Sequence, residues 1–473
     1  MSVVIPNVLA ERYATTEMRE IFDPVTRVRL ERQLWVAVLE AQTELGVPVP
    51  AGAVEAYRSA VDTIDLASIE RRDREIRHDV KARIDEFNAL AGYEEIHKGL
   101  TSRDATENVE QLVVWRALDL VEQRSVALLA RLAEKASALA TIAVVGRTHN
   151  VPAQLTTVGK RFAQVGEELL GAYEALLALR ASFSIRGIKG PVGSQQDQLD
   201  LLGSPEAVQE LERRVAEHLG IPSTLSVVGQ VYPRSLDYAV VAALVRLAAA
   251  PSNLALTIRL MAGHDLATEG FRDGQTGSSA MPHKMNTRSC ERVNGLQTVL
   301  QGHLTMASGL SGDQWNEGDV ACSVVRRIVL PDAFFTIDGL YETIFSVVED
   351  FGVYQGVIRT EIDRYLPFLA TTALLLHGVR NGMGREEAHR VIKEHAVAAA
   401  LQLREGQADG TELLRTLGEA KEFPGNSEEL SRVVDGVMSR LGTIEEQIGS
   451  FCSRVEKIVA ARPEASYAGS DVV

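Results

Sequence analysis

The stretch ENVEQLVVWRALDLVEQRSVALLARLAEKASALATIAVV, residues 107–145, indicates the fold class. Its apolar residues recur every three or four positions, and it contains neither glycine nor proline. In an α-helix this spacing places the apolar side chains along one face. We therefore predict one long helix here, and the pattern recurs in residues 162–183, 237–261, 293–310 and 324–348. Together these stretches predict an all-α protein with a bundle of long helices at its centre.

The lengths of these helices predict association with other copies of the chain. A helix of 25 to 35 residues is about 40 to 50 Å long, which is more than one small domain can cover. Residues 238–262 are apolar on more than one face, as expected where neighbours surround a helix. We divide the chain into an N-terminal helical segment (1–103), a central bundle (104–353) and a C-terminal helical segment (354–473). The last residues, ARPEASYAGSDVV, have the composition of a disordered tail.

Composition and charge restrict the partners. The 473 residues are 45% hydrophobic and carry a net charge of −15, so we expect a globular protein that binds neither nucleic acid nor an anionic membrane surface. We predict a small-molecule partner. Cys290, Cys322 and Cys452 are widely spaced, which predicts neither a disulfide framework nor a zinc site. We recognise no export signal or membrane span and expect a cytoplasmic protein.

Polar islands interrupt the helical pattern at four places, where we expect the chemistry. The first comprises RHDV (77–80) and HKGLTSRD (97–104), which precede the longest helix. A hydroxyl at that helix start can bind an anion or simply cap the helix, and on sequence alone capping is the more common role. The histidines, taken alone, are more often structural than catalytic. The candidate site residues of this island are Arg77, His78, Asp79, His97, Thr101 and Ser102.

The other three islands carry further candidates. GRTHNVPAQLTTVGK (146–160) contains His149, whose imidazole can act as general acid or base near neutral pH. GQVYPRSLD (229–237) contains Gln230, for which an ordinary loop role is more common. TGSSAMPHKMN (276–286) combines glycine with serines, Lys284 and Asn286, a set of donors that can bind a carboxylate. On composition alone, a flexible linker is equally possible there.

The last island carries a specific resemblance. GSSAMPHKMN resembles the signature G-S-S-x-M-P-x-K-x-N of the fumarase/aspartase superfamily, whose members eliminate fumarate from a succinyl-bearing substrate. HKGLTSRD and GRTHNVPAQLTTVGK are similar to the other two segments of that superfamily, in the same order. Within it the chain most resembles the adenylosuccinate lyase family, through ERYATTEM (11–18), RHDV, GQVYPRSLD and SVVRRIVLPDAF (323–334). The resemblance covers nearly the whole chain.

The resemblance implies a fold, an assembly and a reaction. It implies an all-α subunit of three segments whose long central helices form a homotetrameric bundle, with four active sites each built from three subunits. The implied reaction eliminates fumarate from adenylosuccinate to give AMP, and from the succinyl-aminoimidazole-carboxamide ribotide (SAICAR) to give AICAR, in purine nucleotide biosynthesis. No metal or organic cofactor is implied.

The resemblance also implies five catalytic residues. Ser278 is the base that removes a proton from the carbon beside a carboxylate, and Lys284, together with Asn286, stabilises the resulting carbanion. His149 is the acid that protonates the leaving nitrogen, Glu291 orients its ring, and His97 supports the acid site.

The implied substrate-binding residues divide by the part of the substrate. Those assigned to the 5′-phosphate are Arg12, Tyr13, Ser323 and Arg327, with Arg292 between the phosphate and succinyl sides. Those assigned to the succinyl carboxylates are Thr101, Ser102, Thr148 and Gln230, with Asn286 at the carbanion. The remaining substrate contacts are Arg77, His78 and Asp79.

Three positions depart from the family pattern. Thr287 stands where a proline is usual, and Glu107 where an aspartate is usual; we expect both to be tolerated. Gly318 stands where an arginine is often found, so a potential substrate-binding cation is missing and we leave the position out of the site.

Two rival functions remain on sequence. A sister lyase acting on argininosuccinate, or a cycloisomerase acting on a carboxymuconate, shares the signature loop, but the islands around Arg12, Arg77 and Gln230 favour the purine substrate. A helical structural protein that kept the fold without activity is the alternative from another class. The joint presence of the acid, base and carbanion-stabilising residues counts against it.

Replacing Ser278 tests the assignment of the base. We expect Ser278→Ala to lower kcat by about three orders of magnitude or more with little change in substrate binding, because the hydroxyl acts mainly in the transition state. The neighbouring Ser279→Ala is the matched control and should be much milder. Steady-state kinetics on both variants decides the matter, and equal losses would show that the base is misassigned.

Overall fold

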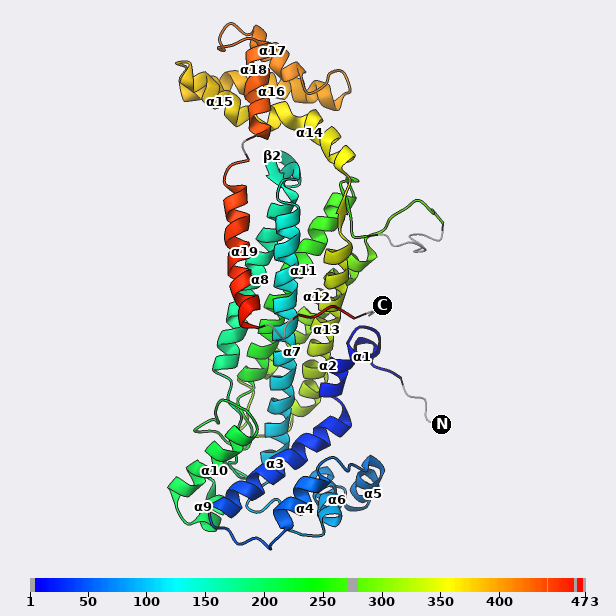
Figure 1. Cartoon of the computed structure of the whole chain (residues 1–473), viewed down its shortest axis with the longest axis vertical. Helices are drawn as coiled ribbons and strands as arrows, with labels where there is room; N and C mark the ends of the chain where they lie inside the picture. Colours follow the sequence, from blue (N-terminus) through cyan, green and yellow to red (C-terminus); the bar gives the residue numbers. More distant parts are fainter. Residues whose placement is uncertain (1–4, 271–279, 440, 463–465, 471–473) are drawn as a thin grey trace.

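The protein is a bundle of long helices with smaller helical groups at both ends (Figure 1). Its computed structural model describes residues 5–270, 280–439, 441–462 and 466–470. The long helices are α7 (Ser102–Ala138), α8 (Val158–Ala181), α11 (Ser235–Ala262), α12 (Arg288–Leu310) and α13 (Cys322–Asp350). The all-α prediction is confirmed, and only short strands accompany the helices in the described part of the chain.

The predicted helix over residues 107–145 is wrong at its C-terminal end. α7 ends at Ala138, and the chain then forms the hairpin of β1 (Ala143–Thr148) and β2 (Val151–Thr157). β-branched residues fill the sequence TIAVV, and such residues favour a pleated strand over a helix. Val144 and Val145 are fully buried in β1, so the apolar pattern that suggested a helix is satisfied by a strand.

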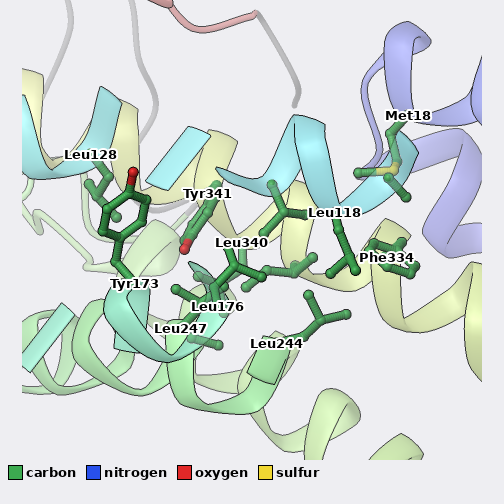
Figure 2. Packing of buried hydrophobic residues seen from close by; sticks show 14 of the residues in the cluster. Met18, Leu118, Leu128, Tyr173, Leu176, Leu244, Leu247, Phe334, Leu340 and Tyr341 are labelled. Atoms are coloured by element: carbon green, nitrogen blue, oxygen red, sulfur yellow. The ribbon is translucent and has the colours of Figure 1, made fainter. Parts of the chain in front are cut away.

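The core of the bundle lies where the long helices face one another. α11 packs against α8, α12 and α13, and α7 packs against α8 and α13. Figure 2 shows the side chains from these helices and α2 that meet in the interior, among them Met18, Leu118, Tyr173, Leu176, Leu244, Leu247, Phe334 and Leu340. α7 and α8 approach so closely that a Cβ on Gly159 would lie 2.2 Å from the carbonyl oxygen of Ala136. A glycine is therefore needed at this crossing.

α11 is the most apolar of the described helices. By length and composition it could cross a membrane, with a mean hydropathy of 1.7 in its most apolar window. However, 56% of that window is buried inside the protein, and α11 contacts three other helices of the bundle. These are the features of a core helix.

The N-terminal helices cover one end and one side of the bundle. α3 packs against α7 and α10, and α1 and α2 pack against α13. These helices are α1 (Val8–Arg12), α2 (Thr16–Ile21), α3 (Pro24–Glu44), α4 (Ala53–Ala60), α5 (Leu66–Ile76) and α6 (Asp79–Ala91), with α9 (Gln196–Leu202) and α10 (Pro205–His218) beside them. The short strands β3 (Ala267–Thr268) and β4 (Gly352–Val353) pair near the opposite end.

The C-terminal helices form a separate apolar cluster, with one exception. The helices α15 (Thr371–Arg380), α16 (Arg385–Arg404), α17 (Glu412–Glu419) and α18 (Ser427–Met438) share that cluster. α14 (Gln355–Leu369) joins it through Leu366, although its buried Ile358 and Ile362 belong to the core of the bundle. α19 (Ile444–Ala461) instead returns to pack on α7 and α8. The division at residues 103 and 353 stays a prediction.

The predicted disorder of the tail is wrong for residues 466–470. Arg131 Nη2 donates to the carbonyl oxygen of Tyr467 at 2.8 Å, and Ser470 donates to the carboxylate of Glu342. Composition could not indicate this, because the partners lie in α7 and α13, far away in the sequence.

Candidate active site

A two-residue turn presents His149 at one end of the bundle. Thr148, the last residue of β1, lies opposite Val151 of β2. His149 and Asn150 form the turn with φ angles of 52° and 60°, the left-handed backbone that favoured two-residue hairpins adopt. Thr148 and His149 are both exposed. The imidazole is therefore available to a ligand or to another chain.

The hairpin is fixed to the C-terminal helices. Arg147 forms an ion pair with Glu361 of α14. Gln154 Nε2 donates to Thr372 Oγ1 of α15 at 3.3 Å. Both interactions link the strands beside His149 to a separate part of the fold, so the turn has a defined position.

Arg77, His78 and Asp79 lie between α5 and α6, near the other end. Arg77 ends α5 with a left-handed φ of 53°. His78 Nδ1 accepts the backbone N–H of Lys81 at 3.2 Å, so the neutral ring carries its proton on Nε2. For Asp79, burial raises the pKa, but its partner Arg83, 3.1 Å away, lowers it, and the net shift is downward. All three predicted residues are exposed.

His97 is held in its neutral form. Its Nδ1 accepts the indole N–H of Trp35 at 3.1 Å, and the two rings meet edge to face. Burial lowers the pKa of His97, the carboxylate of Asp104 raises it, and the charges of His78 and Lys81 lower it, so that the pKa is below its usual value. His97 therefore presents an Nε2–H donor rather than a positive charge near neutral pH.

Thr101 is the N-cap of α7 and Ser102 is its first residue. Asp104 Oδ2 accepts the backbone N–H of Thr101 at 2.7 Å, and a capping box closes the helix start. The other oxygen of the buried Asp104 accepts the backbone N–H groups of Lys189 and Gly190 at 2.8 and 3.1 Å. The capping interpretation is confirmed for Thr101, and the substrate role of both hydroxyls stays a prediction.

Five buried polar side chains join α7, α11 and α13. Glu107 pairs with Arg234 at 2.9 Å, and Arg326 pairs with Asp237 at 2.8 Å. The hydroxyl of Tyr232 donates to Asp237 Oδ1 at 2.7 Å and accepts from Arg326. Burial raises the pKa of Asp237, and the charge of Arg326 opposes this shift. We call these five residues the ionic cluster.

The ionic cluster adjoins three of the predicted substrate residues. Gln230 lies two residues before Tyr232, and its backbone N–H donates to the carbonyl oxygen of Glu317 at 2.7 Å. Ser323 and Arg327 lie on the first turns of α13, on either side of Arg326 in the sequence. The sequence motifs did not indicate that these five residues form a cluster. The available signal was the presence of acidic residues on otherwise apolar faces of long helices.

Gly318 has a structural reason to be glycine. Its φ is 156°, and a Cβ there would lie 3.1 Å from the Cβ of Gln230. An arginine at this position would require a different path for the loop. Gly318 thus lacks the arginine side chain that is often found at this position, and it packs closely against the loop that carries Gln230.

Arg12, Tyr13 and Arg292 come together at the side of the bundle. The guanidinium carbons of Arg12 and Arg292 both lie 5.9 Å from the centre of the Tyr13 ring. Gly339 of α13 permits this placement, because a Cβ there would lie 2.5 Å from the Cβ of Tyr13. Two arginines beside a phenol can bind a phosphate, as the sequence predicts for this group.

The signature loop is only partly placed. Ser278 lies outside the described residues. Lys284 is exposed and Asn286 is half-buried in the stretch 280–287, which projects from the side of the bundle (Figure 1). Glu291 is exposed near the start of α12, whereas Thr148 and His149 lie on the hairpin. The pairing of Glu291 with His149 therefore stays a prediction.

The start of α12, immediately after the loop, is anchored. The buried carboxylate of Glu269 accepts the backbone N–H groups of Ser289 and Cys290 at 3.0 and 2.9 Å. A carboxylate at this position satisfies free N–H groups and interacts favourably with the positive end of the helix. It fixes the helix turn that carries Glu291 and Arg292.

One chain does not bring the predicted residues into one site. α7 has 37 residues and is therefore about 55 Å long. Thr101 lies at its N-terminal end, and the hairpin with His149 follows its C-terminal end (Figure 1). Along α13, 12 residues or about 18 Å separate Arg327 from Gly339, which contacts Tyr13. The predicted residues that the structure describes thus lie in separate places, including the start of α7, the hairpin with His149 and the surroundings of Tyr13.

Comparisons with known proteins show the family to which the chain belongs. A family model described as lyase matches residues 15–302, and a model described as adenylosuccinate lyase C-terminus matches residues 367–451. Adenylosuccinate lyase of Saccharomyces cerevisiae is 34% identical over 98% of this chain and 97% of its own length. The chain belongs to the adenylosuccinate lyase family. The adenylosuccinate lyase of Schizosaccharomyces pombe is 31% identical over 94% of this chain and 93% of its own length.

Solved structures share the fold of this adenylosuccinate lyase family member. The 3-carboxy-cis,cis-muconate lactonizing enzyme from Pseudomonas putida matches with a TM-score of 0.80 and 21% identity, over 96% of this chain and all of that one. A fumarate lyase from Mesorhizobium sp. BNC1 matches with a TM-score of 0.79 and 19% identity, over 94% and 99%. At these identities the likeness concerns the fold alone.

Arg326→Met tests whether the ionic cluster stabilises the ends of α11 and α13. It leaves Asp237 buried without its main partner, so we expect the free energy of unfolding to fall by about 3 to 5 kcal/mol. Arg415→Met is the matched control, because Arg415 pairs with Glu412 and Glu419 on an exposed surface of α17, where ion pairs contribute little. Urea unfolding followed by circular dichroism compares the two, and equal shifts would contradict the assignment.

Proposed function

We infer that this protein is a lyase that eliminates fumarate from adenylosuccinate to give AMP, in purine nucleotide biosynthesis. The observation that carries this conclusion is the match to adenylosuccinate lyases over 94–98% of the chain. We further propose that the same site converts SAICAR to AICAR. The argininosuccinate and carboxymuconate reactions are less favoured, because the C-terminal helices match the adenylosuccinate lyase model and the likeness to the lactonizing enzyme is one of fold.

The proposed mechanism is a β-elimination by a base and an acid. Ser278 removes the proton beside the carboxylate, and the electron pair delocalises into that carboxylate as an aci form with two negative charges. Lys284 and Asn286 stabilise this charge. The C–N bond then breaks, and His149, oriented by Glu291, donates a proton to the purine nitrogen. An unassisted serine is too weak a base, so the positive charge of Lys284 also has to favour its alkoxide.

These side chains can carry out the reaction by acid–base chemistry without a metal or an organic cofactor, and we propose that it uses neither. We also propose a cytoplasmic location, in which the free cysteines stay reduced.

We propose that the active sites are shared between the subunits of a homotetramer. The separation of Thr101 from His149 along α7 supports this, since another chain has to bring His149 to the residues near Thr101. We propose that a second copy of this chain covers the exposed apolar side chains on the long helices. These exposed side chains include Leu256, Leu260, Val299, Met306 and Ile328.

A turnover assay tests the function. The purified protein should convert adenylosuccinate and SAICAR with a loss of the succinyl-purine absorbance and a stoichiometric release of fumarate. Argininosuccinate and carboxymuconate serve as control substrates. Turnover of a control substrate alone would replace the proposed function, and no turnover of any would favour the structural alternative.

Mixing two inactive variants tests the shared site. His149→Gln and Gln230→Ala lie at opposite ends of the bundle, so each tetramer that contains both chains should hold some sites with both native residues. We expect partial recovery of activity after subunit exchange. The double variant mixed with either single variant is the control and should stay inactive. No recovery in demonstrated mixed tetramers would contradict sites made from several chains.

A further inference from the structure

The C-terminal residues 466–470 bind along the bundle. In Figure 1 this dark red segment crosses from the end of α19 toward α1. Arg131 Nη2 donates to the carbonyl oxygen of Tyr467 at 2.8 Å, and the Tyr467 ring packs on Phe345 with ring centres 5.7 Å apart. The guanidinium of Arg124 lies over the Tyr467 ring. We call residues 466–470 the tail.

The tail donates two hydrogen bonds to the buried carboxylate of Glu342. The backbone N–H and the hydroxyl of Ser470 both donate to Glu342 Oε2, at 2.7 and 2.9 Å. The side chain of Glu342 is 1% exposed, and its other oxygen lies 3.8 Å from Arg124 Nε. A buried carboxylate needs such donors to remain charged. Because Ser470 supplies two hydrogen bonds, Glu342 depends less on an ion pair with Arg124.

Arg124 can then form an ion pair with a residue of α2. Its Nη2 forms an ion pair with Glu17, whose side chain is 61% exposed, although Arg124 itself is nearly buried. The adjacent Thr15 donates its backbone N–H to Asp338 Oδ2 of α13 at 2.7 Å. These two interactions hold the start of α2, which directly follows Arg12 and Tyr13.

We propose that Ser470 and Tyr467 are positioning residues for the substrate-binding pair Arg12 and Tyr13. Without the tail, Glu342 loses both donors of Ser470, and Arg124 Nε, 3.8 Å from its other oxygen, is left to pair with it. Arg124 then turns from Glu17 to Glu342, because a buried charge without a partner costs more than an exposed ion pair contributes. α2 keeps its apolar packing and the bond from Thr15 to Asp338 but loses its ion pair with Arg124, and Arg12 and Tyr13 bind the phosphate less well. This step rests on the proposed function of that pair.

Kinetics of tail variants provides the first test. Deletion of residues 467–473 should raise KM for adenylosuccinate about tenfold with kcat nearly unchanged, as expected when ground-state and transition-state binding weaken equally. Ser470→Ala should raise KM by a smaller factor, and Ser470→Thr, which keeps both donors, should restore it. Ser466→Ala, on the same tail and exposed, is the matched control and should behave like the wild type. A wild-type KM after the deletion would overturn the proposal.

A second test separates the tail from the proposed function. Deletion of residues 467–473 should speed hydrogen exchange of the amides of residues 15–18 about tenfold or more. Exchange in the hairpin at residues 143–157 should stay unchanged. This measurement needs no substrate. In the Glu342→Gln background the buried charge is absent, so the deletion should change KM less than about twofold. If the wild type does not turn over adenylosuccinate, the proposed function fails, whereas unchanged exchange at residues 15–18 would sink the tail proposal alone.

Discussion

The length of α7 constrains the whole active site. A continuous helix of 37 residues keeps its two ends about 55 Å apart, and the chain places predicted site residues at both ends. This separation supports the proposal that the active sites are shared between chains, and α11, α12 and α13 carry exposed apolar side chains suited to such association. The long helices thus determine both the fold and the separation of the predicted site residues.

Buried charge gives this helical scaffold its defined local positions. Leucine-rich helices can slide past one another at little cost, whereas a buried ion pair has one arrangement in which its atoms are satisfied. The pairs of Glu107 with Arg234 and of Arg326 with Asp237 fix where α11 and α13 begin relative to α7. The carboxylate of Glu269 does the same for the start of α12. Each of these sites is close to predicted substrate residues.

The pair Arg12 and Tyr13 illustrates how a weakly structured part of the chain can be held in place. α1 has only five residues and is too short to be stable alone. Its position comes from the glycine at position 339, the bond from Thr15 to Asp338 and the ion pair from Arg124 to Glu17. Thr15, near one end of the chain, and Ser470, near the other, thus bond to carboxylates one helical turn apart on α13.

The sequence was sufficient for the helices of the bundle, because apolar spacing over more than 20 residues has one physical solution, and for the superfamily, because a ten-residue signature is specific. It was insufficient at TIAVV, where the same apolar residues satisfy a strand, and at the tail, where Tyr467 and Ser470 find partners more than 100 residues away. The grouping of the site residues also could not be read from the sequence: neighbouring islands in the chain lie at opposite ends of α7. The physical reason is that periodicity reports how a residue faces its own helix, whereas the distance between residues on different helices depends on how those helices pack.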